Sequence, residues 1–147
     1  MNAEQVKLVQ ESFQKVVPIA DAAATLFYGR LFDLDPSLEP LFKGDMVEQG
    51  RKLMQMLGMA VISLDRLEQV LPAVRALGVR HARYGVRERD YVTVGRALIW
   101  ALRKGLGEDF TPQAEAAWVD VYTTLAGEMK SAQAAAAART EALALTR

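Results

Sequence analysis

The sequence of 147 residues contains no cysteine, which excludes disulfides, thiolate catalysis, zinc–thiolate sites and cysteine-ligated iron–sulfur clusters. It contains a single histidine, His81, so a metal site built from several histidines is excluded as well. A catalytic triad that depends on histidine would have to use this one imidazole. A cofactor that needs only one nitrogen ligand from the protein stays possible.

The sequence also lacks an excess of charge of either sign and any long apolar run. The 18 lysine and arginine residues balance 18 aspartate and glutamate residues, so no overall charge favours nucleic acid or an anionic membrane. No apolar run approaches the roughly 18 residues that cross a bilayer. The first residues, MNAEQVKLVQ, lack the basic and apolar regions of a secretory signal. We therefore expect a cytoplasmic protein with no nucleic-acid partner and no membrane partner.

Apolar residues recur at helical spacing along almost the whole chain, and no strand-like alternation is long enough to predict a strand. In the first segment, the apolar positions that follow each other at steps of three or four are Val6, Val9, Phe13 and Val16. The length fits one domain with a sizeable core. The sequence therefore predicts an all-α fold.

The ends of the expected helices are marked by capping residues, proline and glycine. We expect a first helix ending at Pro18, helices over about 19–34, 36–42, 46–62 and 65–84, and then two long helices, the second opening at Thr111-Pro112. Capping boxes are expected for Asn2 with Gln5, Asp45 with Glu48, and Asp65 with Glu68. Pro72 predicts a bend or a break near residue 71, and Gly85 a C-terminal stop.

His81 lies on the apolar side of its expected helix, four residues after Leu77 and seven after Val74. This phase predicts that the imidazole faces inward. The periodicity alone leaves two interpretations open, a buried structural histidine and a ligand to a cofactor such as haem.

The segments on both sides of His81 resemble those of globins, especially neuroglobin-like and single-domain bacterial haemoglobins. The second half, residues 77–129, has a Gly-x-x-His before a turn, the step VTVG, and the motif AAWVDVY. In the first half, LFYGRLFDLDPSLEPLF resembles the second globin helix and the corner after it, and QGRKLMQMLGMAV resembles the distal helix. The resemblance covers about residues 3–130.

The resemblance implies a globin fold, a 3-over-3 helical sandwich around a b-type haem. It divides the chain into a globin domain, residues 1–132, and an alanine-rich tail, residues 133–147. The tail has high helix propensity but little to bury, so we expect it to extend the last helix and to fray.

The resemblance makes His81 the proximal ligand of the haem iron. A neutral imidazole is a suitable nitrogen donor, and its other ring N–H is expected to donate to a backbone carbonyl one turn earlier. The alternative role for His81 is purely structural.

On the distal side, the resemblance places Gln49, Tyr28 and Leu53 around a gas ligand. The phenol and the amide are expected to donate hydrogen bonds to bound dioxygen, and Gln49 is also expected to orient the phenol. The alternatives are that Tyr28 only packs and that Gln49 points to solvent. Because the chain has no second histidine, bis-histidine ligation is impossible and the sixth iron site should be open or hold water.

Other residues are expected to line the haem or to reach its propionates. The apolar and aromatic candidates are Phe42, Leu53, Leu77, Val86, Tyr91, Val94 and Tyr122. Lys52, Arg80 and Arg83 are candidates for the propionates, and solvated side chains without a role are the alternative. Ligation of ferric iron by Tyr28 or Lys52 is left open.

The function expected from the resemblance is reversible dioxygen binding, for storage or scavenging. The alternatives are nitric oxide dioxygenation with an external reductase, and gas sensing. In flavohaemoglobins a tyrosine and a glutamate support the proximal histidine, and this sequence has Tyr91 but the neutral Gln133 at those positions. Enzymatic activity therefore stays open. The expected ligands are dioxygen, nitric oxide or carbon monoxide. The expected oligomeric state is a monomer or a weak homodimer.

Overall fold

The computed structural model describes residues 1–145, so the last two residues of the predicted tail, Thr146 and Arg147, lie outside the described part. The α-helices of the described chain are α1 (Ala3–Val16), α2 (Ala20–Leu34), α3 (Met46–Ile62), α4 (Leu67–Arg83), α5 (Glu88–Leu106) and α6 (Pro112–Leu145). Short 3₁₀ segments connect several of them, at Val17–Ile19, Pro36–Leu41, Ser63–Arg66 and Gly107–Asp109. No strand occurs between residues 1 and 145, so the all-α prediction is confirmed.

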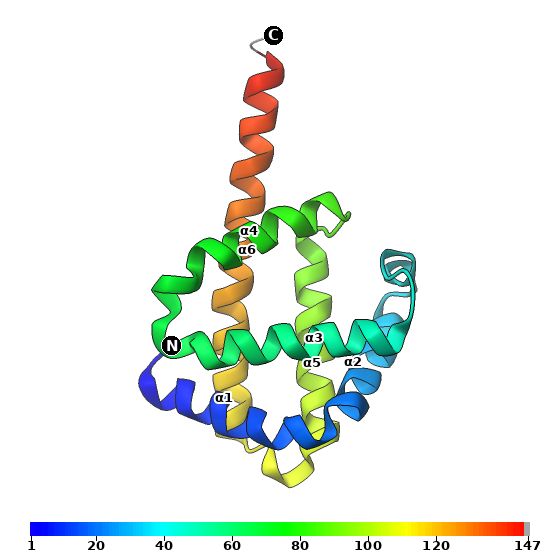
Figure 1. Ribbon diagram of the computed structural model, residues 1–147, viewed down its shortest axis with the longest axis vertical. Helices are drawn as coiled ribbons and strands as arrows, with labels where there is room; N and C mark the ends of the chain where they lie inside the picture. The colour runs from blue at the N-terminus through cyan, green and yellow to red at the C-terminus, as the bar shows by residue number, and fades with distance from the viewer. Residues whose placement is uncertain (146–147) are drawn as a thin grey trace.

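The helices form two crossing layers. Helix α5 packs against both α2 and α6, and helices α1, α3 and α4 lie across this layer (Figure 1). Contacts of α1 and α4 with α6, and of α3 with α2, join the two layers. Helices α3 and α4 follow each other in the chain but hardly contact each other, since each packs mainly on other elements.

The hydrophobic core lies between α1, α2, α5 and α6. Its most buried side chains include one from each of these four helices, namely Val9, Leu31, Ala97 and Trp118. The indole N–H of Trp118 donates to the hydroxyl of Ser12 at 2.7 Å, and that hydroxyl donates to the carbonyl of Leu8. Both buried polar groups are thus satisfied, and the pair fixes α1 against α6.

Of the three predicted capping boxes, one is complete, one is present in part and one is wrong. Asn2 and Gln5 form the complete capping box of α1. Asp45 caps α3 by accepting from the Val47 N–H, although no reciprocal bond from Glu48 is present. Asp65 does not cap α4: it lies inside the 3₁₀ segment Ser63–Arg66, which tightens the chain before the helix begins.

Pro72 does not break α4, which is continuous from Leu67 to Arg83. The proline lies in the second turn, where its missing N–H removes one hydrogen bond of the helix. The apolar contacts of the rest of α4 with α6 outweigh that loss. The C-terminal stop is as predicted, because Gly85 ends the turn after α4 with φ of +91°, a conformation that favours glycine.

The alanine-rich segment continues α6 as far as Leu145 and projects beyond the other helices (Figure 1). Its last side chains, from residue 137 to residue 145, are all exposed. Helix propensity without a buried face explains this arrangement. The division into a globin domain and a tail stays a prediction.

Among the described residues, no helix combines the length and the apolar character needed to cross a membrane.

Helix α4 lies close to the backbone of α6 at Gly78. A Cβ atom at this position would lie 2.7 Å from the Cα of Met129 and would also contact the Met129 carbonyl oxygen. Because these are backbone atoms, the neighbour cannot turn aside as a side chain would. Gly78 therefore sets the position of α4, and with it the position of His81 one turn later.

Gly78→Ala should lower the free energy of unfolding by about 1–3 kcal/mol, because a methyl group must displace backbone in a packed interface. Urea denaturation followed by circular dichroism measures this change. Gly29→Ala is the matched control, since Gly29 is also in a helix and has nothing within 4 Å of its Cβ position. That substitution should stabilise the protein by about 0.5–1 kcal/mol. Equal effects of the two changes would show that α4 adapts freely to α6.

Candidate functional site

His81 lies near the end of α4 and is held by the backbone on one side and by an aromatic ring on the other. Its carbonyl accepts from the Val86 N–H at 2.9 Å, which closes the turn after the helix. Its ring lies 6.3 Å from the ring of Tyr91 on α5, between the ring centres. The side chain of His81 is half-buried, which agrees with the inward direction predicted from its helical phase.

The imidazole makes no hydrogen bond within residues 1–145, and its Nδ1 is buried without a partner. The expected bond to a backbone carbonyl one turn earlier is thus absent, which corrects that prediction. Burial and the nearby Arg80 guanidinium lower the pKa of His81, so the ring is neutral at neutral pH. A half-buried imidazole whose Nδ1 has no partner suits a ligand better than a structural hydrogen-bonding residue.

Tyr91 and Gln133 form a hydrogen-bonded pair behind His81. The Tyr91 hydroxyl donates to Oε1 of Gln133 at 3.3 Å, and Nε2 of Gln133 donates to the Val86 carbonyl at 3.0 Å. The pair connects α5, α6 and the turn after His81. Gln133 therefore occupies the place inferred for it from the sequence, and it is a neutral acceptor for the phenol.

Tyr28 lies on α2 among aromatic rings and is 8% exposed. Its ring is edge-on to those of Phe27 and Phe42, at 5.0 and 5.2 Å between ring centres. Its hydroxyl has one long hydrogen bond, 3.4 Å to the backbone carbonyl of Gln49 on α3. Burial raises the pKa of Tyr28 to about 12, so the phenol stays protonated and keeps its proton for donation.

The side chain of Gln49 points away from Tyr28. Its Nε2 donates to the carbonyl of Lys43, in the loop before α3, at 3.0 Å. We expected the Gln49 amide to orient the phenol. In the structure, the hydroxyl of Tyr28 instead donates to the backbone carbonyl of Gln49. The nearby loop carbonyl competes for the amide, which a sequence pattern does not reveal.

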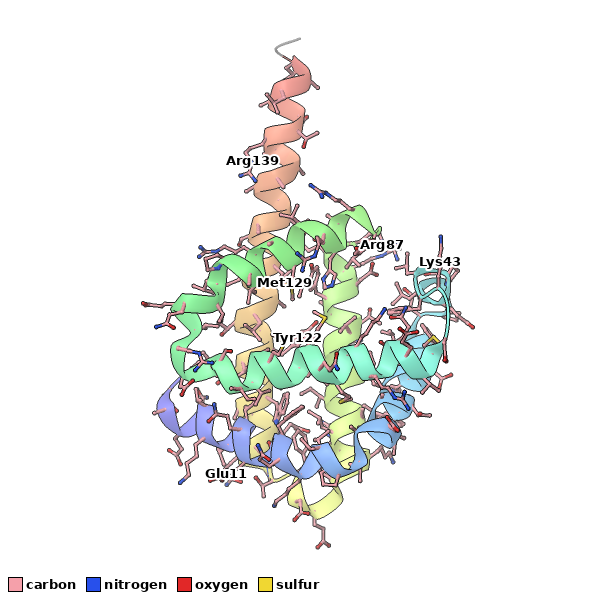
Figure 2. All side chains as sticks on the ribbon, viewed as in Figure 1. Glu11, Lys43, Arg87, Tyr122, Met129 and Arg139 are labelled. Carbon is pink, nitrogen blue, oxygen red and sulfur yellow. The ribbon has the colours of Figure 1, made fainter. Side chains whose placement is uncertain are left out.

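Several apolar side chains of α3 and α4 are only half-buried. On α3 these side chains are Leu53 and Leu57, and on α4 they are Val74 and Leu77. Figure 2 views the molecule with these two helices toward the reader and Tyr122 and Met129 labelled between them. Apolar faces that do not pack on each other suit a flat apolar group between the two helices.

The remaining predicted residues fall into three groups. Phe42, Leu53 and Val94 are partly buried and pack on the core, while Val86 accepts the bond from Gln133. Lys52 is exposed and pairs with Glu48 at 3.8 Å along α3. Arg80 and Arg83 are exposed at the end of α4, with no ion pair to residues 1–145.

Tyr122 is better described as a contact between α5 and α6 than as a residue beside His81. Its hydroxyl donates to the Tyr91 carbonyl at 2.5 Å. Its ring lies over Gly95, where a Cβ atom would be 2.7 Å from the ring. Burial raises the pKa of Tyr122. It thus fixes the backbone of Tyr91, and its place in a haem pocket stays a prediction.

A charged cluster beside the site was missed from the sequence. Asp90, at the start of α5, is 2% exposed and accepts from the Arg87 N–H at 2.8 Å and from the Arg87 guanidinium at 3.2 Å. The same guanidinium lies 3.9 Å from Asp35, ahead of the corner that contains Phe42. The cluster fixes the corner to α5. The only sequence signal was an aspartate three residues after an expected helix start.

No group of three or more His, Cys, Asp or Glu side chains between residues 1 and 145 is arranged to hold a metal ion. The comparison with protein families decides which kind of protein this is. The globin family model matches residues 25–129. The chain belongs to the globin family.

Sequence relatives support this family membership. The globin chain is 24% identical over 143 residues to neuroglobin from Tetraodon nigroviridis and to neuroglobin-1 from Oncorhynchus mykiss. Each alignment covers 88% of this globin and 90% of the relative.

Solved structures agree on the fold. An engineered carbene transferase derived from RmaNOD of Rhodothermus marinus, for which nitric oxide dioxygenase activity has been proposed, is 26% identical. It superposes with a TM-score of 0.85 and covers 96% of this globin and 99% of that chain. A bacterial globin from Campylobacter jejuni is 23% identical, with a TM-score of 0.77 and coverage of 90% and 96%.

A third structure, flavohaemoglobin from Malassezia yamatoensis with bound FAD and haem, is 22% identical with a TM-score of 0.78. It covers 93% of this globin, but only 37% of the flavohaemoglobin chain is matched. The globin fold is thus confirmed, and haem-based gas binding is the property that the family membership supports. The cytoplasmic location and the oligomeric state stay predictions.

Proposed function

We propose that this globin binds dioxygen reversibly at a non-covalently held haem b, for storage or scavenging, with His81 on the proximal side and Tyr28 on the distal side. The observation that carries the proposal is the half-buried imidazole on α4, whose Nδ1 is buried without a hydrogen-bond partner. The buried phenol of Tyr28 on α2 is the second group that supports it. The chain has no cysteine, so thioether attachment of the haem is impossible.

The residues of α3 and α4 fit such a group. The half-buried apolar side chains of Leu53, Leu57 and Leu77 provide the apolar walls, and Phe42 adds an aromatic ring from the corner. The guanidinium groups of Arg80 and Arg83, exposed at the end of α4, are placed to pair with carboxylates at the edge. When bound, haem supplies a ferrous iron atom that takes up small gas ligands.

On the distal side Tyr28 acts as the hydrogen-bond donor. Its hydroxyl now donates to the Gln49 carbonyl over 3.4 Å. This hydrogen bond is long and therefore weak, so a stronger acceptor can take the place of the carbonyl. The buried surroundings strengthen such a bond relative to one in water. The Gln49 amide requires release from the Lys43 carbonyl before it can take part, so we assign it the smaller role.

On the proximal side, Tyr91 limits the rotation of the His81 ring, and Gln133 fixes the Tyr91 hydroxyl. A neutral amide withdraws no proton from the phenol and adds no charge near the imidazole. This arrangement favours stable gas binding over strong electron donation.

Optical spectra of the haem-loaded protein test the proposal. We expect the ferrous protein to show a distinct spectrum under oxygen that returns to the deoxy spectrum when oxygen is removed, over several cycles. Oxidation at the first exposure to oxygen, or failure to take up haem, would contradict it. Carbon monoxide serves as the control ligand, because it tests the iron without needing the Tyr28 hydrogen bond.

The second candidate is nitric oxide dioxygenation, favoured by the 26% identity to RmaNOD over nearly the whole chain. This reaction consumes dioxygen and nitric oxide, gives nitrate, and requires a reductase from outside the chain. Sustained nitric oxide consumption with a supplied reductase would support it. Consumption limited to one equivalent per haem, with the same reductase present, would support storage or scavenging.

A further inference from the structure

A second cavity lies between α2, α5 and α6, away from the helices that carry Gln49 and His81. Its volume is about 600 Å³, and no residue of α3 or α4 lines it. We name it the α2–α5–α6 cavity. A volume of this size is typical of sites for small organic molecules.

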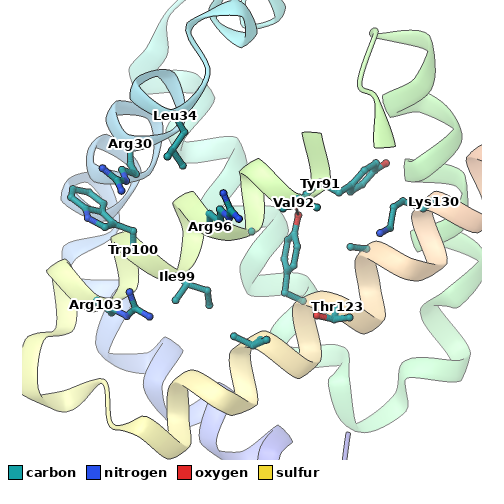
Figure 3. A pocket seen from close by; sticks show the side chains of 14 residues that line it. Arg30, Leu34, Tyr91, Val92, Arg96, Ile99, Trp100, Arg103, Thr123 and Lys130 are labelled. Atoms are coloured by element: carbon teal, nitrogen blue, oxygen red, sulfur yellow. Dashed lines mark hydrogen bonds between the residues drawn. The ribbon is translucent and has the colours of Figure 1, made fainter. Parts of the chain in front are cut away.

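The lining of the α2–α5–α6 cavity combines an apolar floor with positive charge. The floor includes Ile99 and Trp100, and the cationic side chains are those of Arg30, Arg96, Arg103 and Lys130. No aspartate or glutamate lines the cavity. Figure 3 shows the three arginines around Trp100 and Ile99, and Lys130 at the opposite end.

Three of these cations have no counter-ion. Arg30, Arg96 and Lys130 make no ion pair with any residue from 1 to 145, whereas Arg103 is paired with Glu115. The three unpaired positive charges, with no carboxylate in the lining, repel one another unless an anion joins them. The electrostatics of the lining therefore favour a negatively charged occupant.

Arg30 gives the most specific indication. Its guanidinium lies 5.2 Å from the centre of the Trp100 ring, and its Nε is buried with no hydrogen-bond partner. A buried N–H of a charged group that lacks an acceptor is costly. A carboxylate or phosphate oxygen beside Trp100 would pair with the same guanidinium group through its other N–H donors.

We propose that the α2–α5–α6 cavity binds an organic anion with an apolar body, a carboxylate or a phosphate on an acyl chain. The anionic head lies among the arginines around Trp100, and the chain lies on the apolar floor between α5 and α6. This site is separate from the gas-binding site. Tyr91 lines the cavity and also lies beside His81.

Isothermal titration calorimetry of the haem-loaded protein tests the proposal, with laurate and monododecyl phosphate as probes below their micellar concentrations. At least one of them should bind at a single saturable site, and the tighter one identifies the preferred head group. Dodecanol, which has the same chain without the charge, and acetate, which has the charge without the chain, should each bind at least about tenfold more weakly. Equal binding of dodecanol would overturn the proposal.

Variants locate the site. Arg30→Gln and Arg96→Gln together should weaken binding at least about tenfold, because charge-assisted hydrogen bonds to the anionic head are lost. Thr123→Trp, from an exposed lining position, should block the cavity. Arg139→Gln, on the exposed end of α6, is the control and should bind like the parent protein. Unchanged binding in the double variant and in Thr123→Trp, with circular dichroism showing both folded, would overturn the assignment.

Discussion

His81→Ala should yield a folded protein that contains little haem. The substitution removes the only imidazole of the chain. Loss of a residue that is only hydrogen-bonded to a metal ligand lowers metal affinity about 10–100-fold. Removal of the ligand itself should therefore lower the affinity for haem even more. The fold should survive, because the ring makes no hydrogen bond within the described residues and alanine favours the helix. The ratio of haem absorbance to protein absorbance after purification measures the loss.

Two controls separate ligation from stability. Tyr84→Ala removes another ring close to the end of α4, but one that is 66% exposed, and it should keep its haem. Added imidazole should restore haem uptake to the His81→Ala protein, because the free base fills the space that the side chain left. Normal haem content in His81→Ala without imidazole would show that another residue holds the iron.

Tyr28→Phe should accelerate dioxygen dissociation roughly 5- to 150-fold. The estimate follows from a hydrogen bond worth about 1–3 kcal/mol, with about 1.4 kcal/mol for each factor of ten. The change should hardly alter folding, because the hydroxyl has only the 3.4 Å bond to the Gln49 carbonyl. Stopped-flow replacement of oxygen by carbon monoxide measures the rate.

The acceleration should be the same at every pH between about 6 and 10, because a phenol with a pKa near 12 keeps its proton throughout this range. Because burial raises the pKa of Tyr28, its hydroxyl stays protonated, and able to donate, to a higher pH than a free phenol. Tyr84→Phe removes an exposed phenol and should leave the rate unchanged. An unchanged rate in Tyr28→Phe would mean that Tyr28 only packs in the aromatic cluster. An effect that disappears well below pH 10 would mean that the phenol ionises more easily than its burial implies.

The elements of the fold followed from local signals in the sequence. Helix α3 has the predicted bounds, 46–62, because its cap Asp45 and its apolar spacing are both local. The mistakes came where local signals compete. Asp65 and Glu68 had the spacing of a capping box, but the chain used that stretch for a 3₁₀ turn. Pro72 predicted a bend or a break, and the break does not occur because the packing of α4 on α6 compensates for one lost bond.

The candidate site was predictable as a set of residues and less so as a set of contacts. The single histidine and its helical phase pointed to His81, and the resemblance to globins pointed to His81 and Tyr28 as candidates. The orientation of Gln49 was not predictable, because the acceptor that holds its amide, the Lys43 carbonyl, belongs to a loop whose path depends on the whole corner. The cluster of Arg87, Asp90 and Asp35 was missed for the same reason, since Asp35 is far from the other two in sequence.

The sequence by itself determined the all-α class, the positions of the helices, and the limit of one imidazole, because each depends on residue type and on neighbours within one or two turns. Only the tertiary structure decided how closely α4 approaches α6 at Gly78, which carbonyl holds the Tyr28 hydroxyl, and that unpaired arginines gather around Trp100. These features arise where helices distant in sequence cross. The crossing is determined by the packing of the whole core rather than by any segment alone.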